Sequence, residues 1–233
     1  MNAVYDLLTR GMTYDFATFL VSARTLGADH VHFRFNGKLQ AKKFPAEVAW
    51  KRFENIVKPL CDLAGVTHSI GPGGSGIEPE AHAGTVEALY RKLGRIWKFP
   101  QTGKGDYVTV TLRDSFRNQH RNSSPAWAEF IERSKRKVIV LPECEDNPIP
   151  ISLRMELYAN AAMNFGVNNG PMALCLFSEA PYRVFKMLAS DDMRRHHEKT
   201  GFPKNSQFSF RNDKQLIVWK DDTLDVLMSH IED

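Results

Sequence analysis

The order of apolar segments along the chain limits its fold more than any other feature of the sequence. Short apolar runs of strand length alternate with longer segments whose apolar residues recur at helical spacing. The predicted strands are residues 4–8, 31–35, 66–70, 107–112, 137–141, 165–167, 182–186 and 215–219, with 137–141 read as a buried strand. The predicted helices are residues 14–26, 45–64, 80–97, 126–134, 153–162, 171–177 and 223–231, and residues 191–201 form a surface helix or loop.

Strands that are separated by helical segments favour βαβ units and a mainly parallel sheet. The sequence therefore predicts an α/β fold with two Rossmann-like halves. Residues 99–106 are polar and rich in turn-forming residues, which is typical of a boundary. We expect an N-terminal half over residues 1–104 and a C-terminal half over residues 105–233.

Composition excludes several classes of protein. Of the 233 residues, 42% are hydrophobic and 25% are charged, which is ordinary for a globular protein. The net charge of +4 is too small to predict nucleic-acid binding, but it is compatible with phosphorylated small molecules. The cysteines, Cys61, Cys144 and Cys175, are odd in number and widely spaced, which favours free thiols in a reducing compartment. With no 18-residue apolar run and no signal-peptide pattern, we expect a cytoplasmic protein without a transmembrane segment.

The turn after the strand at 165–167 contains Asn168, Asn169 and Gly170, followed by Pro171 at the first turn of a predicted helix. Free backbone N–H groups at such a helix start bind anions, and phosphate is the common biological case. A tight turn that needs Asn and Gly for its backbone angles is the alternative explanation.

Two other strands of the C-terminal half are also followed by polar residues. The segment after residue 112 carries Arg113, Ser115, Arg117, His120 and Arg121. Arginine forks match phosphate oxygens, although a solvated basic linker would have the same composition. Glu143 follows the strand at 137–141, where a carboxylate can accept hydrogen bonds from ribose hydroxyls or belong to an ordinary acidic loop.

The N-terminal half offers a parallel set after its first strand. Arg10 and Gly11 can face the same cleft from the opposite side. Asp15 is a candidate acid or base, and a first-turn residue that the helix dipole favours is the alternative. His120 is the second candidate base.

Other motifs predict no further chemistry. The segment 71–76 (GPGGSG) lacks the lysine and the spacing of a P-loop, which favours a flexible loop. Asp192, His196 and His197 do not form a convincing set of metal ligands, so a solvated charged face is favoured over a metal site.

The sequences VTVTLRDS, KVIVLPE and YANAAMNFGVNNGPMALCLFSEAPYRVFKM resemble the nucleotide-sugar-binding half of GT-B glycosyltransferases. The likeness is to uncharacterised glycosyltransferase-like proteins of bacterial surface-polysaccharide type, and it covers roughly residues 105–230. It implies that Arg113, Ser115, Glu143, Asn169 and Gly170 face the donor, that the acceptor enters from the N-terminal half, and that no metal is needed. The chain is short for a full GT-B enzyme.

The predicted function is transfer of a sugar from a nucleotide-diphosphate donor to a saccharide or other small acceptor, without a metal or cofactor. Two alternatives remain open at this point. One is a nucleotide-sugar epimerase or isomerase, and the other is a nucleotide-sugar-binding protein without catalysis.

Overall fold

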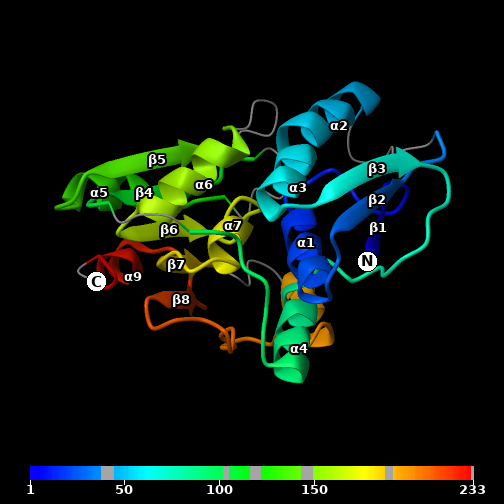
Figure 1. Cartoon of the computed structure of the whole chain (residues 1–233). Helices are drawn as coiled ribbons and strands as arrows, with labels where there is room; N and C mark the ends of the chain where they lie inside the picture. The colour runs from blue at the N-terminus through cyan, green and yellow to red at the C-terminus, as the bar shows by residue number, and fades with distance from the viewer. Residues whose placement is uncertain (38–44, 102–104, 116–121, 143–148, 187–190, 232–233) are drawn as a thin grey trace.

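The computed structural model contains two parallel β-sheets, one from each part of the chain (Figure 1). It describes residues 1–37, 45–101, 105–115, 122–142, 149–186 and 191–231. The first sheet has the order β1-β2-β3, with β1 (Asn2–Asp6), β2 (His30–Arg34) and β3 (Thr67–Gly71). The second has the order β5-β4-β6-β7-β8, with β4 (Val108–Leu112), β5 (Val138–Pro142), β6 (Met163–Val167), β7 (Tyr182–Phe185) and β8 (Gln215–Val218). Every strand pair is parallel, which confirms the α/β prediction.

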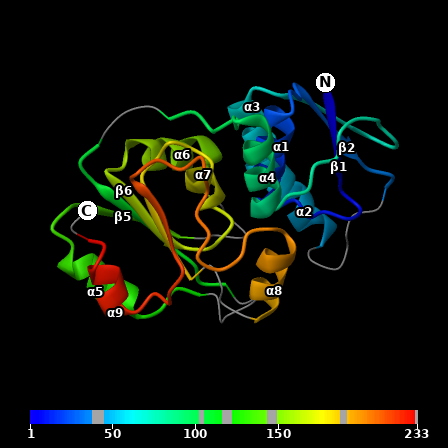
Figure 2. The same cartoon turned by 90° about the horizontal axis from the view of Figure 1, so that it is seen from below.

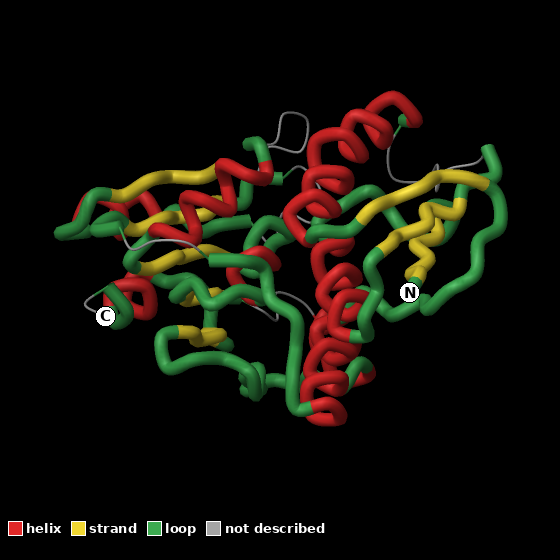
Figure 3. The backbone as a smooth tube through the Cα atoms, viewed as in Figure 1, coloured by secondary structure: helices red, strands yellow, loops and turns green. Residues whose placement is uncertain are grey.

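Helices connect the strands in the predicted alternation (Figure 3). They are α1 (Asp15–Thr25), α2 (Ala46–Arg52), α3 (Lys58–Ala64), α4 (Ala83–Leu93), α5 (Ala126–Arg133), α6 (Ile151–Asn160), α7 (Ala173–Leu176), α8 (Asp191–Lys199) and α9 (Leu224–Met228). The predicted helix at 45–64 runs through α2 and α3, joined by a π-helical segment over Phe53–Val57. Gly65 and Gly94 end α3 and α4 in the left-handed conformation that glycine adopts without strain.

The two faces of the first sheet differ because β2 alternates in sequence. Val31 and Phe33 are buried, whereas His30, His32 and Arg34 lie on the other, half-buried face. Phe33 packs against Phe16 of α1 and Phe53 beside α2.

The glycine-rich segment after β3 is a loop, as predicted, and it lies against the polar face of this sheet. Arg34 Nε donates to the carbonyl oxygen of Gly73 at 3.2 Å. A Cβ on Gly74 would collide with the ring of His32, so this close approach requires glycine.

The second sheet is covered on both faces. On one face α5 and α9 pack over a cluster that includes Trp127, Phe130 and Phe165. The other face is covered by α6 and α7. These two helices also contact the first part of the chain, where α7 meets α1 and α6 meets α3 (Figure 1). A single buried cluster continues across this junction, with Phe19 from α1 and Phe177 after α7 among its members.

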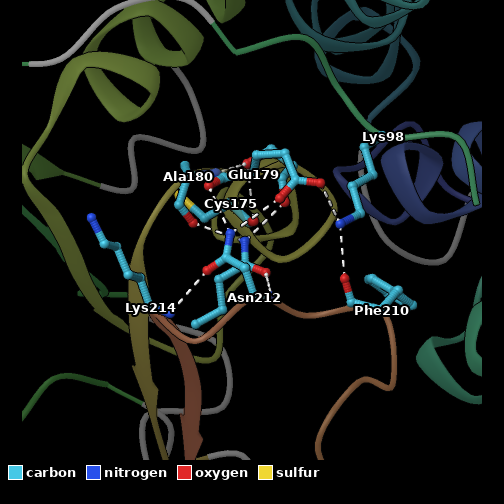
Figure 4. Close-up of polar contacts among 9 residues, drawn as sticks. Lys98, Cys175, Glu179, Ala180, Phe210, Asn212 and Lys214 are labelled. Atoms are coloured by element: carbon cyan, nitrogen blue, oxygen red, sulfur yellow. Dashed lines mark hydrogen bonds and ion pairs between the residues drawn. The ribbon is translucent and has the colours of Figure 1, made fainter.

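The chain after α4 joins the two parts and is anchored to both (Figure 4). The N–H of Trp97 donates to Oγ1 of Thr25 in α1, and the N–H of Phe99 donates to the carbonyl oxygen of Phe177. Between them, Lys98 Nζ donates to Glu179 Oε1 at 2.6 Å and to the carbonyl oxygen of Phe210 at 2.8 Å. The predicted boundary between residues 104 and 105 borders residues 102–104, which lie outside the described ranges, and it stays a prediction.

Candidate functional site

A cleft of about 590 Å³ lies where the loop after β1, the start of α4 and the loop after β6 meet. Six of the predicted site residues line it, three from each part of the chain: Arg10, Gly11, Asp15, Asn168, Asn169 and Gly170. The carboxyl end of β6 and the loop after β1 thus face one another, as the sequence predicts.

The other predicted residues do not line this cleft, or lie outside the described part of the chain. Arg113 and Ser115 are both buried. The N–H of Arg113 donates to Oγ of Ser123, and the N–H of Ser115 donates to Oδ1 of Asn122. Arg117, His120, Arg121 and Glu143 fall in residues that the structure does not describe, so their roles stay predictions.

Arg10 is held so that its cation lies in the wall of the cleft. Its Nη1 donates to the carbonyl oxygen of Pro79 at 2.8 Å, and its Nη2 lies 3.5 Å from Glu80 Oε2. The guanidinium also stacks over the rings of Tyr5 and Phe19, 5.5 and 5.6 Å from their centroids. Aromatic contacts and hydrogen bonds together limit the side chain to one orientation, which suits recognition of an anion.

Asp15 is the first residue of α1, and its side chain is exposed in the cleft. Thr13 Oγ1 donates to Asp15 Oδ2 at 3.0 Å, and the same hydroxyl accepts from the Asp15 N–H at 3.2 Å. This pair of contacts orients the carboxylate and leaves Oδ1 available to the cleft.

Tyr5 links the charges of Asp15 and Arg10. Burial raises the pKa of the Tyr5 hydroxyl, Asp15 raises it further and Arg10 lowers it, so both charges act on the same phenol. The hydroxyl stays protonated and donates to the carbonyl oxygen of Gly11 at 2.8 Å. Tyr5 therefore supports the backbone of the loop rather than serving as an acid or base.

Asn169 lines the cleft and carries a buried donor without a partner in the described part of the chain. The residue is only 4% exposed, and its Oδ1 accepts a hydrogen bond from the N–H of Met172 at 3.1 Å. Its Nδ2 has no hydrogen-bond partner within the described part of the chain. A buried amide donor without a partner is costly, which favours a ligand acceptor at this position.

The expected helix-end anion site needs correction at the same turn. The predicted helix at 171–177 is only four residues long in α7, too short to build a substantial dipole. The N–H of Met172 is bonded to Asn169, and the N–H of Ala173 donates to the carbonyl oxygen of Gly170. These two N–H groups are therefore not available to an anion, whereas Asn169 Nδ2 has no hydrogen-bond partner within the described ranges.

Several residues that line the cleft were not predicted from the sequence to belong to it. Glu80 and His82 reach it from the loop before α4, with 3.9 Å between Glu80 Oε2 and His82 Nε2. Tyr14 lines it from the residue before α1. His197, considered above as a metal ligand, lines the cleft from α8 and packs against the ring of Trp219.

Tertiary packing brings these residues together. Viewed from below, α8 lies on the side of the first part, near α4 (Figure 2). The carbonyl oxygen of Thr200, just after α8, lies so close to Gly84 that a Cβ there would collide with it. The start of α4 and the end of α8 therefore meet at this glycine, beside the cleft.

Neither a metal centre nor a membrane span is found among the described residues. No three His, Cys, Asp or Glu side chains of the described ranges gather as ligands for a metal ion. None of the helices in those ranges combines the length and the apolar character needed to span a bilayer.

Comparison with known proteins gives one structural likeness. No protein-family model matches the sequence, and no curated protein matches it either. Among solved structures, the chain is similar to the bacterial iron-containing dodecameric glycosyltransferase TibC from enterotoxigenic E. coli H10407, with a TM-score of 0.46 and 10% sequence identity. The match covers 79% of this chain and 57% of that one, so the chain spans little more than half of the length of that glycosyltransferase.

Proposed function

We propose that this chain is a metal-independent glycosyltransferase of the GT-B type, acting in the cytoplasm on surface-polysaccharide precursors. It would transfer a sugar from a nucleotide-diphosphate donor to a hydroxyl of a saccharide or other small acceptor. The observation that supports this most directly is the composition of the cleft. An exposed carboxylate (Asp15) and a fixed cation (Arg10) come from one part of the chain, and an unpartnered amide donor (Asn169) comes from the other.

The donor is proposed to lie against the loop after β6. Asn169 Nδ2 would donate to a phosphate oxygen, because that donor has no protein acceptor within the described ranges. Gly170 has no side chain to keep the ligand away from the backbone. Arg10, from the facing loop, would stabilise the negative charge that the diphosphate gains on leaving.

The acceptor is proposed to lie near Asp15. In the reaction, an acceptor hydroxyl oxygen forms a bond to the anomeric carbon of the donor sugar, and the bond between that carbon and the diphosphate oxygen breaks. The diphosphate leaves with the electron pair, and Asp15 takes the proton of the hydroxyl. Arg10 and Asn169 carry the electrostatic part of this reaction, so the proposed step uses no metal.

The proposal is tested by ligand binding followed by product analysis. Thermal-shift measurements with UDP, GDP, ADP and CMP and their common sugar conjugates should give a selective stabilisation. A ligand at one hundred times its dissociation constant adds about 2.7 kcal/mol. The conjugate that binds is then incubated with a panel of saccharide acceptors.

The products distinguish the three candidate functions. A new glycoside supports the transferase, an altered free sugar nucleotide indicates an epimerase, and an unchanged bound conjugate indicates a binding protein. If none of the nucleotides or sugar conjugates raises the melting temperature, all three candidate functions are contradicted.

A further inference from the structure

Arg154 of α6 is a buried cation without an acidic partner in the described part of the chain. Its side chain is 1% exposed. Nη1 donates to the hydroxyl of Tyr158 at 3.0 Å, and Nη2 donates to the carbonyl oxygen of Pro142 at 2.9 Å. Nε has no hydrogen-bond partner, and no carboxylate of the described ranges forms an ion pair with the group.

The described groups around this guanidinium do not neutralise it. Its electrostatic neighbours are Tyr158, Tyr14 and Cys175. Burial raises the pKa of the Tyr158 hydroxyl and of the Cys175 thiol, so both are neutral near pH 7. A guanidinium cannot lose its proton under these conditions. Within the described part of the chain this buried positive charge therefore has no countercharge, and an uncompensated buried charge is costly.

The position of this charge relates it to the cleft. Pro142 is the last residue of β5, and the Tyr158 hydroxyl is hydrogen-bonded at 2.8 Å to Oγ1 of Thr111, near the end of β4. Arg154 therefore lies at the carboxyl edge of the second sheet. Tyr14, one of its electrostatic neighbours, lines the cleft and contacts Gly170. Arg154 does not itself line the cleft, and Tyr14, which does, is its electrostatic neighbour.

We propose that Arg154 is a positioning residue for the diphosphate, whose negative charge it attracts through the wall of the cleft without contact. This inference rests on the proposed function and adds the source of the positive field. Because the charge is shielded from water, its field is weakened less by solvent than that of a surface cation. The ligand would supply the countercharge that the described residues lack.

Substitution by methionine separates this role from a structural one. An uncompensated buried charge is costly, and an apolar side chain of similar length removes that cost. Arg154→Met should therefore keep or raise the melting temperature while weakening anion binding. A purely structural arginine would instead lose stability and affect every ligand alike.

The experiment measures the affinity of the full-length chain for UDP, GDP and ADP, for the matching nucleosides and for inorganic pyrophosphate. For the nucleoside diphosphate that wild type binds, Arg154→Met should weaken binding about tenfold, or about 1.4 kcal/mol. Its affinity for the matching nucleoside should stay within about twofold, and Arg154→Lys should retain most of the diphosphate affinity. Arg183→Met is the control, because Arg183 is also buried and donates to the carbonyl oxygens of Tyr182 and Lys214, near the other end of the strands.

The outcomes separate the two proposals. If wild type binds none of the nucleoside diphosphates or pyrophosphate, the proposed function fails and this inference fails with it. If wild type binds but folded Arg154→Met binds the diphosphate equally well, or loses nucleoside and diphosphate alike, only the role of Arg154 is overturned. Should Arg154→Met not fold, Arg154→Gln and Arg154→Lys replace it, and equal pyrophosphate affinity of these two variants overturns the inference.

Discussion

The Cβ of Tyr14 lies 2.8 Å from the position that a Cβ on Gly170 would occupy. Tyr14 immediately precedes α1 and Gly170 belongs to the loop after β6, so the two parts of the chain touch at this point. Real Cβ atoms essentially never come this close to another heavy atom, so a side chain on residue 170 would force a neighbour to shift. The glycine is therefore required by packing between the parts, in addition to any role in binding.

Gly170→Ala should destabilise the fold by about 1–3 kcal/mol, because the added methyl group must displace Tyr14. Urea unfolding measures this loss, and nucleotide binding should weaken with it. Gly71→Ala is the matched control, since its Cβ would meet only His32 Cε1 at an ordinary 3.7 Å. Equal stability of the two variants would contradict the close approach.

Asn169→Asp should bind nucleoside diphosphates at least about tenfold more weakly while the protein remains folded. The carboxylate keeps the oxygen that accepts from the Met172 N–H, but it replaces the free donor with a negative charge. Isothermal titration gives the affinity, and circular dichroism checks the fold. Asn160→Asp, which makes the same change at the end of α6, should leave binding intact. An Asn169→Asp variant with wild-type affinity would remove this amide from the proposed donor site.

Asp15→Asn should lower kcat by about 10²–10⁴-fold with little change in donor affinity, since the amide cannot take the acceptor proton. Turnover and nucleoside diphosphate binding are measured on the same preparation. The competing explanation, a first-turn residue favoured by the helix dipole, predicts only a small loss of stability. Asp225→Asn removes a first-turn carboxylate from α9 and shows the size of that effect. If both variants turn over at the wild-type rate, Asp15 is not the base.

The ion pair between Lys98 and Glu179 should make stability depend on pH in acid. Burial alone would raise the pKa of Glu179, but hydrogen bonds from Lys98 and Asn212 outweigh it and hold the pKa below its ordinary value of 4.5. The unfolded chain therefore takes up this proton first as the pH falls. The stabilisation is complete above about pH 4.5 and is lost as the pH drops through the lower, folded-state pKa.

Glu179→Gln should consequently flatten part of the acid dependence of the free energy of unfolding. At pH 7 the substitution should lower the free energy of unfolding by less than about 1 kcal/mol, because the Glu179 side chain is 54% exposed. Urea unfolding at a series of pH values measures both effects. Glu54→Gln, in an exposed pair with Lys58, serves as the comparison. Identical pH profiles for wild type and Glu179→Gln would show that the pair contributes nothing.

The order and type of the secondary-structure elements could be predicted because each carries a local pattern. Alternation in β2 and the helical spacing of Phe16, Phe19 and Leu20 do not depend on the rest of the fold. The residues just after each strand were also informative, since parallel strands bring their carboxyl ends to one edge. Arg10, Asp15 and Asn169, which line the cleft, were predicted in this way, and their roles stay predictions.

Features set by tertiary packing could not be predicted locally. Residues 137–141 look like a buried strand, yet β5 is at the edge of the sheet and Val140 is 42% exposed. Arg113 comes after a strand end as Asn169 does, but its loop turns back to Ser123 instead of lining the cleft. Glu80 and His197 reach the cleft only because the start of α4 meets the end of α8.

The buried cluster that runs from α1 to the residues around α7 has a consequence for how the protein unfolds. Phe19 and Phe177 belong to the same cluster although a different sheet lies beneath each. Separating the two parts would expose apolar surface on both, so neither part can be lost at little cost to the other. Two sheets joined in this way should unfold together in one cooperative transition. The m-value of urea unfolding should then correspond to the surface exposed by the whole chain.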